Sequence, residues 1–265
     1  MANVDNWDPK AYTTVASFVP KLATRVVSLL DLQPNDNLLD LGCGSGELTS
    51  SLSPLCSSIT AIDSSPSMIS ACPSLPNTTF LVSSALSLSS DISQFSKIFS
   101  SAALHWILRT TPEARAQFFS SIYSLLSPGG SFVSEAGAHG NIAEIHAAII
   151  AVLTHRGVPI EKARDSCPWW FGSEGEYRGL LEAAGFKVEV METELRQTRL
   201  TEDAEGGIRG WVRLFAADML TCLEEGEREE AVREVEEILK SVTVRETGGR
   251  WVNYVRIRFV ARRER

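Results

Sequence analysis

The sequence predicts an α/β fold: a doubly wound, mostly parallel sheet of seven strands with helices on both faces. The main observation is that short apolar segments alternate five times with helical ones, which favours right-handed crossovers between parallel strands. A second observation is that a glycine-rich loop follows the first strand, at the edge where such sheets bind ligands. Two more strand-like segments, at 187–195 and 250–261, complete the sheet.

The first half of the chain predicts its elements in order. Apolar residues at helical spacing predict a helix within 13–31, and "QPND" then predicts a turn. Five strands are expected at 37–43, 57–65, 78–86, 95–107 and 131–137. Helices are expected between them, and the one at 112–130 carries Pro at its start and Gly-Gly at its end.

The second half is less regular. Helices are expected at 141–157, 174–186, 206–223 and 227–240, and an aromatic loop at 167–173. The segment "SVTVRETGGRWVNYV", residues 241–255, is also compatible with a hairpin through Gly248 and Gly249. We expect one domain over 1–265, with a core at about 12–195 and 250–262, a lid inserted at about 196–250, and a second lid loop at about 157–176.

Composition excludes several classes of protein. A net charge of −8 over 265 residues argues against a nucleic-acid partner, which requires a basic face. The five cysteines form no CxxC pair, and no apolar segment follows a basic start, so we expect reduced thiols and a cytoplasmic protein. The longest apolar run, 147–153, is too short for a membrane span, and no metal site is expected. A monomer and a homodimer are equally compatible with the sequence.

The glycine loop "GCGSG" limits the kind of ligand. A dinucleotide fingerprint would place its third glycine where Glu47 stands, whereas here the glycines are Gly42, Gly44 and Gly46. The carboxylates of Asp40 and Glu47 would repel a pyrophosphate but would favour a cofactor that carries ammonium and sulfonium cations. The alternative is a tight strand-to-helix turn without a ligand.

Asp63 ends the second predicted strand, where an acid can accept hydrogen bonds from both hydroxyls of a ribose. The alternative is that Asp63 caps the following helix. Together, the loop and the acid on consecutive parallel strands predict an adenosine-containing ligand.

Four segments, "LLDLGCGSGELTSSL", "AIDSSPSMI", "SAALHWI" and "LLSPGGSFVSE", resemble the successive motifs of class I S-adenosylmethionine-dependent methyltransferases over roughly residues 12–136. "NWDPKAY", "ALHW" and "EYRGLLEAAGF" are similar to the trans-aconitate methyltransferase-like group. The resemblance implies a Rossmann-like fold, S-adenosyl-L-methionine as cofactor, S-adenosyl-L-homocysteine as product, and a small-molecule acceptor.

The resemblance also implies roles for individual residues. It assigns the methionine end of the cofactor to Asp40, Gly42, Gly44 and Gly46, and the ribose to Asp63. It assigns the remaining cofactor contacts to Ser64, Met68, Ser84 and Ala85 around the adenine, Ser101 and Ala102 beside the sulfonium, and Tyr12 above the cofactor. The family often has acids where Ser84 and Ser96 stand and Asn where Ser101 stands, so contacts to the adenine and beside the methyl group are in doubt.

Two histidines are candidates for the reaction itself. His105 and His139 follow the fourth and fifth strands, at the ligand edge of the sheet. Each is interpreted as a general base, as a donor to an anion, or as a structural residue of the wall or of a turn. His146 and His155 lie on a helix without a partner at ligand spacing and are assigned no role.

Aromatic residues of the second half predict an acceptor pocket, with packing of the lid core as the alternative for each of them. The candidates are Trp106, Trp169, Trp170, Phe171, Trp211 and Phe215. Arg196, Arg199 and Arg209 are candidate anchors for an acceptor carboxylate, the alternative being ion-paired surface residues.

We expect methyl transfer to an oxygen of a small organic acceptor, a carboxylate or a phenol or enol, rather than to nitrogen or carbon. Three alternatives remain open: a cofactor-binding scaffold without activity, an enzyme that uses the sulfonium only as an electrostatic catalyst for a rearrangement, and a nicotinamide oxidoreductase, which the glycine spacing disfavours.

Overall fold

The protein is described by a computed structural model over residues 7–15, 22–88, 94–202 and 206–265. Its sheet has seven strands in the order β3-β2-β1-β4-β5-β7-β6, and β7 runs antiparallel to both of its neighbours. The predicted fold class is therefore confirmed. The strands are β1 (Asn37–Leu41), β2 (Ser58–Asp63), β3 (Thr78–Val82), β4 (Phe95–Ser101), β5 (Leu126–Gly137), β6 (Lys187–Arg199) and β7 (Trp251–Arg262).

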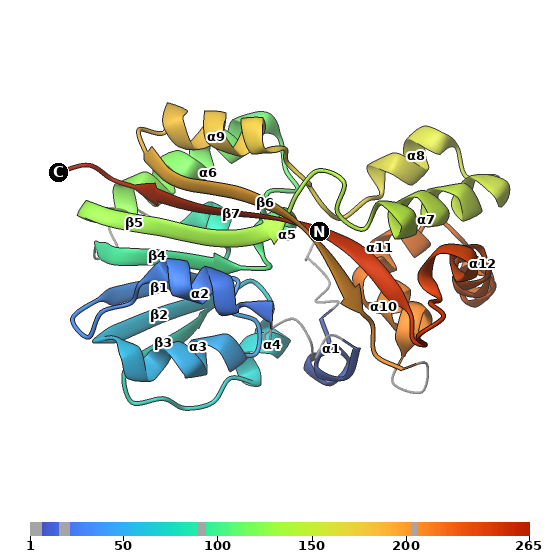
Figure 1. Cartoon of the computed structure of the whole chain (residues 1–265), viewed down its shortest axis with the longest axis horizontal. Helices are drawn as coiled ribbons and strands as arrows, with labels where there is room; N and C mark the ends of the chain where they lie inside the picture. The colour runs from blue at the N-terminus through green and yellow to red at the C-terminus, as the bar shows by residue number, and fades with distance from the viewer. Residues whose placement is uncertain (1–6, 16–21, 89–93, 203–205) are drawn as a thin grey trace.

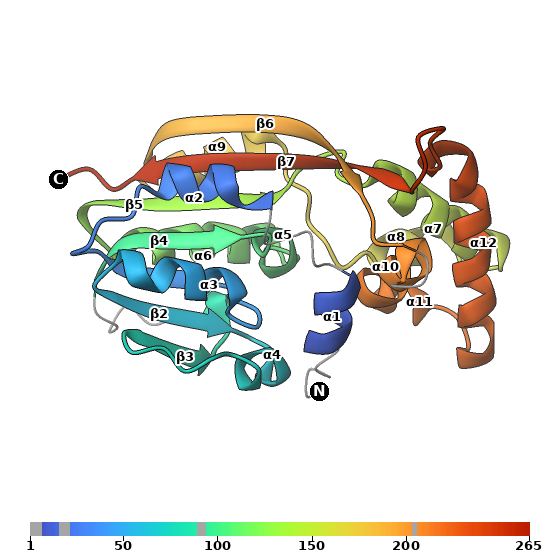
Figure 2. The same ribbon diagram turned by 60° about the horizontal axis from the view of Figure 1, so that its bottom comes forward.

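Helices connect these strands and form a separate group beside the sheet (Figures 1 and 2). Their α-helical members are α1 (Pro9–Val15), α2 (Thr24–Leu30), α3 (Glu47–Leu52), α4 (Pro66–Ser70), α5 (Leu104–Ile107), α6 (Pro112–Leu125), α7 (Ala143–His155), α8 (Ile160–Asp165), α9 (Glu174–Ala183), α10 (Gly207–Phe215), α11 (Ala217–Leu220) and α12 (Glu225–Thr243). The 3₁₀ turns are η2 (Ser53–Leu55) and η3 (Ala85–Ser87).

Two apolar layers hold the sheet between helices. On one face, Val26 of α2 and Leu52 of α3 belong to one apolar cluster, and α2 packs against β4, β5 and β7. On the other face, Phe119 of α6 and Tyr177 of α9 pack against Phe132 of β5. Both helices of this second layer begin with a side-chain cap, which fixes where they start.

The second group of helices, α7, α8, α10, α11 and α12, forms a lobe at one end of β6 and β7 (Figures 1 and 2). It has its own apolar core, which includes Ile149, Trp211 and Val235. The long antiparallel pair β6–β7 connects the sheet to this lobe, from Lys187 opposite Arg262 to Arg199 opposite Trp251. The predicted lid, 196–250, thus begins inside β6, and its described helices are α10, α11 and α12.

Several predicted elements are shorter than expected. Instead of one helix within 13–31, the structure has α1 and α2, with residues 16–21 outside the described ranges. The fourth strand ends at Ser101, because Ala102 has a left-handed φ of 57°, and α5 follows. The alternative hairpin is present only at its tip: Val244 and Arg250 form an antiparallel bridge around the turn that contains Gly248 and Gly249, while α12 continues to Thr243.

Within the described ranges, no helix combines the length and the apolar character needed to cross a bilayer.

Candidate functional site

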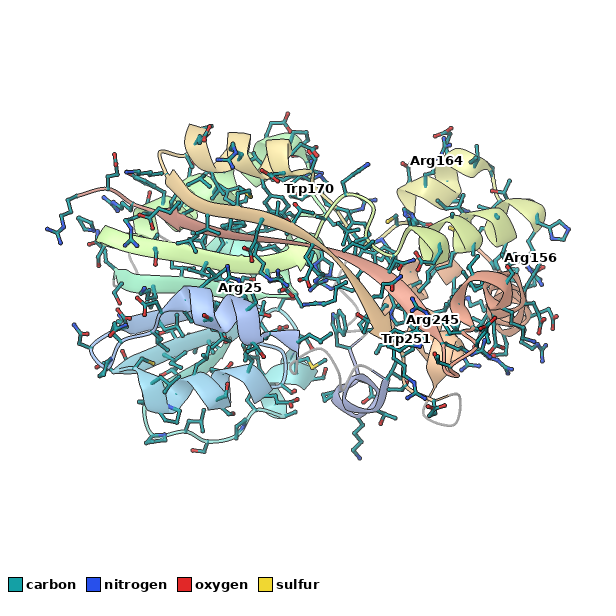
Figure 3. The ribbon with its side chains drawn as sticks, viewed as in Figure 1. Arg25, Arg156, Arg164, Trp170, Arg245 and Trp251 are labelled. Carbon is teal, nitrogen blue, oxygen red and sulfur yellow. The ribbon has the colours of Figure 1, made fainter. Side chains whose placement is uncertain are left out.

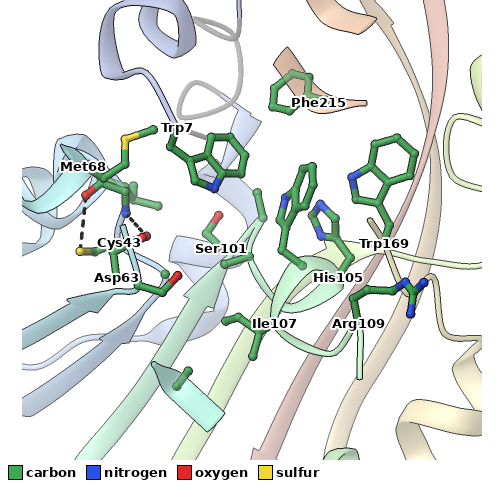
Figure 4. Close-up of a pocket in the computed structure, with 18 of the residues that line it drawn as sticks. Trp7, Cys43, Asp63, Met68, Ser101, His105, Ile107, Arg109, Trp169 and Phe215 are labelled. Carbon is green, nitrogen blue, oxygen red and sulfur yellow. Dashed lines mark hydrogen bonds between the residues drawn. The ribbon is translucent and has the colours of Figure 1, made fainter. Parts of the chain in front are cut away.

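A cavity of about 440 Å³ lies at the carboxyl ends of β1, β2 and β4, where the sheet meets the helical lobe. Figure 4 shows its two ends: Asp63 and Met68 lie at one, and His105, Trp169 and Phe215 lie at the other. We call these the cofactor end and the acceptor end, after the roles that we propose for them.

The glycine loop exposes bare backbone at the cofactor end. Gly44 has a φ of 57°, and a Cβ on it would meet nothing within 4 Å, so its backbone faces open space in the cavity. Gly42 has a φ of 73°, and a Cβ there would lie 2.3 Å from the Cβ of Ala103. Gly46 is different: it precedes α3 and faces Phe80, and it does not line the cavity. Only the first two glycines therefore expose backbone to a ligand.

The Asp63 carboxylate is fixed at the end of β2. One oxygen accepts the N–H of Gly44 at 3.0 Å, and the other accepts the N–H of Ser65 at 2.9 Å. The cap of α4 is Ser65, whose hydroxyl accepts the N–H of Met68, so the predicted alternative of Asp63 as helix cap is wrong. Asp63 lines the cavity, with Ser64 and Met68 beside it.

Asp40 is a second acid at the cofactor end, and only 3% of it is exposed. Its carboxylate accepts a hydrogen bond of 2.7 Å from the Thr49 hydroxyl. Burial, with a smaller contribution from the charge of Asp63, raises the pKa of Asp40 to about 6. The two acids give this end a negative potential, which suits a cationic ligand and disfavours a pyrophosphate.

The loops after β3 and β4 complete the wall of the cofactor end. Ser84, Ala85, Ser101 and Ala102 all line the cavity, as predicted. Ser96 does not, since its hydroxyl donates to Asp36 at the opposite end of β4. Tyr12 belongs to α1, but its side chain lies outside the described part of the structure.

Aromatic rings form most of the acceptor end. Trp106, Trp169, Phe171, Trp211 and Phe215 line the cavity, as predicted for each of them. The rings of Trp169 and Phe171 stack with their centroids 5.6 Å apart, and those of Trp211 and Phe215 are 5.1 Å apart. This end is a largely apolar cavity wall with few polar groups.

Trp170 was predicted to belong to this pocket, but it does not line the cavity. Its ring lies 5.0 Å from that of Tyr177 in α9, and the Arg115 guanidinium lies 4.5 Å from its centroid (Figure 3). Adjacent residues of an extended segment point to opposite sides, so Trp169 and Phe171 face the cavity and Trp170 faces α9.

Of the three arginines considered as anchors, only Arg196 lines the cavity. Arg209, which was predicted to be a pocket residue, lies outside the cavity wall and donates to Glu236 at 2.6 Å, and Arg199 pairs with Glu202 at 2.5 Å. Arg209 thus pairs with a carboxylate of a helix and Arg199 with a carboxylate of a loop.

Arg256 is a cationic wall residue that the sequence interpretation missed. It lies on β7 beside Arg196 of β6, and both bond Glu135 of β5: the Arg196 distance is 3.1 Å and the Arg256 distance is 3.3 Å. A third arginine, Arg258, donates to the same carboxylate at 2.5 Å. Burial of Glu135 alone would raise its pKa, but Arg256, Arg196 and Arg258 together lower it.

His105 is a buried residue of the acceptor end, and 7% of it is exposed. Its Nδ1 accepts the backbone N–H of Gly137 at 3.2 Å. Burial and the nearby charge of Arg256 hold the pKa of His105 well below its usual range. His139, the other predicted histidine, is exposed and does not line the cavity; its backbone N–H bonds the carbonyl of Gly172 in a turn after β5. The structure therefore places His139 outside the cavity wall.

Several wall residues come from segments that gave no clear signal in the sequence. Trp7 lies 5.2 Å from Trp106, ring to ring, and its only signal was the motif "NWDPKAY". Tyr254 and Arg256 come from the alternating β7, where every second residue faces the cavity side. Among the residues that the structure describes, no group of three His, Cys, Asp or Glu is placed to hold a metal ion.

Comparisons with known proteins agree with this geometry. A family profile described as a methyltransferase domain matches residues 38–130, which contain the glycine loop, Asp63 and β4. The chain is 38% identical over 264 residues to an uncharacterized methyltransferase of Schizosaccharomyces pombe, covering 98% of this chain and 99% of the relative. It is 26% identical over 277 residues to a trans-aconitate 2-methyltransferase of Enterobacter, covering 98% and 99%.

A solved structure with the same fold is a Haemonchus contortus phosphoethanolamine N-methyltransferase in complex with phosphomonomethylethanolamine and S-adenosylhomocysteine. Its TM-score is 0.60 at 15% identity, and the match covers 100% of this chain and 58% of that one. The match along almost the whole length of a relative shows the family, and it agrees with the sheet order, the bare glycine loop and the acid that ends β2. The chain therefore belongs to the class I S-adenosylmethionine-dependent methyltransferases.

Proposed function

We propose that this enzyme methylates an oxygen of a small organic acid, with the acceptor bound as a carboxylate. The observation that carries the proposal is a positive charge without its own counter-ion at an otherwise aromatic end of the cavity.

The cofactor is assigned to the acidic end. S-adenosylmethionine supplies a methyl group on a cationic sulfur, and its amino group is a second cation. Asp40 is the buried acid nearest the glycine loop and is assigned to the methionine part, together with the backbone of Gly42 and Gly44. Asp63 is assigned to the ribose hydroxyls, and Ser64, Met68, Ser84 and Ala85 to the adenine.

Ser101 lies between the two ends (Figure 4), and it is assigned with its neighbour Ala102 to the position of the transferred methyl group. The acceptor is then assigned to the aromatic end, where Trp106, Trp169 and Phe215 exclude water from it. Alignment of the acceptor in a dry pocket contributes most to a methyl transfer, because the reaction needs no covalent help from the protein.

The charge of the acceptor end follows from the ion pairs. Arg258 has Glu194 as a partner of its own, and Glu192 pairs with Arg25 at 3.0 Å. Glu135 is then the one counter-ion that Arg196 and Arg256 share, and both arginines line the cavity. In addition, Arg196 Nε is buried without a partner among the described residues. One guanidinium charge of this pair is thus available for an anion, and a guanidinium binds a carboxylate with two parallel hydrogen bonds. Arg109, the third arginine of the cavity wall, donates to the backbone carbonyls of Cys167 and Asp165.

The relatives support an acid as acceptor. The Enterobacter protein carries the name of an enzyme that acts on trans-aconitate, an unsaturated carboxylic acid. The aromatic wall of this chain suits an unsaturated or aromatic acid, whose flat carbon skeleton can pack between rings.

The test is methyl transfer to a panel of acids, with the corresponding amides, phenols and amines as controls. We expect release of S-adenosylhomocysteine and methyl ester formation with at least one aromatic or unsaturated acid. Replacing Arg256 by Met should lower kcat/KM for that acid by about 10–100-fold, the factor for a lost hydrogen bond to a charged group.

The matched control is Arg209→Met, an arginine on the lobe that does not line the cavity, which should leave kcat/KM within twofold. Affinity for the cofactor should be unchanged in both variants. Turnover of phenols or amines but of no acid would contradict the proposal.

A further inference from the structure

The loop after β4 places the His105 ring against a backbone N–H of β5, and this contact fixes the tautomer of the ring. β4 pairs with β5 up to Ser101 opposite Glu135, and in a parallel ladder the N–H of Gly137 would bond the carbonyl of Ala102 in the next step. Ala102 instead has a φ of 57° and turns the chain away from β5. The N–H of Gly137 donates to Nδ1 of His105 at 3.2 Å.

Gly137 is required for this arrangement. A Cβ on Gly137 would lie 2.8 Å from both the Asn141 side-chain nitrogen and the Phe171 ring. The absence of a side chain lets the Phe171 ring approach the imidazole, with their centroids 5.8 Å apart. The imidazole is held by a backbone group of a central strand on one side and by aromatic rings on the other.

The consequence concerns the other ring nitrogen. A neutral imidazole has one N–H, so if Nδ1 accepts a hydrogen bond, Nε2 carries the proton. No described residue provides a hydrogen-bond partner for Nε2. This nitrogen is not fully buried. His105 lines the cavity, so its partner is a molecule inside it.

Burial, followed by the charge of Arg256, keeps His105 neutral. The ionisable side chains of the acceptor end are Arg256 and Tyr254 of β7, Arg196 of β6 and Arg109 after α5. Burial raises the pKa of Tyr254 to about 12, and its hydroxyl accepts the Trp211 indole N–H at 2.7 Å. The cavity carboxylates Asp40, Glu47 and Asp63 belong to the other end. Among the described residues, the acceptor end therefore presents cations and neutral donors but no carboxylate that could take a proton.

We propose that His105 acts as a hydrogen-bond donor of fixed tautomer, with Nε2–H bonded to the non-attacking oxygen of the acceptor carboxylate, and that the enzyme uses no general base. The proposal rests on the proposed function. A carboxylate that becomes a methyl ester uses an oxygen lone pair for the new C–O bond, while the electron pair of the broken C–S bond remains on sulfur. No proton has to leave, whereas a phenol or an ammonium group has to lose one.

Paired substitutions separate a donor from a base. His105→Gln keeps a neutral N–H donor near the position of Nε2 and cannot act as a base, whereas His105→Phe removes the donor. With the best carboxylic acid of the panel, we expect His105→Phe to lower kcat/KM by about 10–100-fold and His105→Gln to stay within about fivefold of the wild type. His155→Gln, an exposed histidine of α7, is the matched control and should change nothing.

The pH profile provides a second readout. The wild type should show a flat kcat/KM between pH 6.5 and 9, because neither the acid nor His105 titrates there. A loss of about tenfold per pH unit on the acidic side, together with a His105→Gln variant as inactive as His105→Phe, would establish a base and overturn the proposal.

The tautomer can also be measured without turnover. In a protein labelled with ¹⁵N in histidine, we expect the His105 ring to remain neutral with its proton on Nε2 between pH 6 and 8. A proton on Nδ1, or a charged ring, would refute the donor even if the variants fail to fold. A carboxylic acid methylated equally well by His105→Phe would refute only the role of His105, whereas transfer to phenols alone would refute the proposed function as well.

Discussion

The two ends of the cavity are built in different ways. The cofactor end comes from residues 40–102, where the ends of consecutive parallel strands place backbone N–H groups and two acids side by side. The acceptor end comes from separate segments between Trp7 and Arg256 that meet only where β6 and β7 leave the sheet for the lobe (Figure 2). One end has carboxylates, and the other has guanidinium groups and rings.

This difference assigns separate tasks to the two ends. Backbone geometry after a parallel strand is set by local sequence, so the cofactor end is suited to one ligand that all members of a family share. Side chains from distant elements can change independently, so the acceptor end is suited to determine specificity. The opposite charges of the two ends make this separation testable.

The largest effect is expected from removing the acid on which the acceptor end depends. Glu135→Gln should lower the free energy of unfolding by about 3–5 kcal/mol at pH 8, because buried arginines lose their shared counter-ion. Urea denaturation measures this. Since the pKa of Glu135 is lowered by folding, its contribution is present above its unfolded pKa and is lost as pH falls through the folded value. Wild type should therefore lose more stability on acidification than the variant.

Glu194→Gln is the control for this experiment. Its carboxylate is 44% exposed and pairs only with Arg258 among the described residues, so its loss should cost less than about 1 kcal/mol. Equal losses for the two variants would contradict a special role of Glu135.

The next effect concerns the cofactor end alone. Asp63→Ala should weaken S-adenosylmethionine binding by about 1.5–3 kcal/mol, because a charged hydrogen-bond acceptor is lost. Calorimetry measures the affinity, and Arg256→Met should bind the cofactor as the wild type does. If both variants weaken the cofactor alike, the two ends are not separate.

Acidity should affect the cofactor end by a smaller amount. The pKa of Asp40 is raised to about 6, and a cationic ligand favours its charged form, so binding releases a proton and affinity falls as pH falls through 6. We expect binding about tenfold weaker at pH 5 than at pH 8, measured by calorimetry. Asp40→Asn should bind weakly at both pH values, and a wild-type affinity that does not change with pH would contradict the assignment.

The smallest effect is expected at His139. His139→Ala should leave kcat/KM within twofold, because this side chain is exposed and lies outside the cavity wall. Steady-state kinetics with the best acceptor measures it. A loss as large as that of His105→Phe would place the acceptor elsewhere.

The sequence predicted the sheet and most of the cofactor end. Alternating strands and helices, the glycines at 42 and 44 and the acid that ends the second strand are signals within short segments, because consecutive strand ends come together in a parallel sheet. His105 was found for the same reason, because it follows a strand end, and the aromatic loop was found from its residue types. Those signals did not distinguish Trp170 from its neighbours, because the side to which an extended segment turns depends on what packs against it.

What the sequence by itself determined is the class of enzyme and its cofactor, since local motifs carry both. Only the tertiary structure decided which arginines line the cavity: Arg256 gave no signal, while Arg209 is paired with a helix carboxylate outside it. It also decided which group meets Nδ1 of His105, because the N–H that bonds it belongs to another strand. Charge pairing and tautomers depend on contacts between residues far apart in the chain, and no spacing of residues along the sequence encodes them.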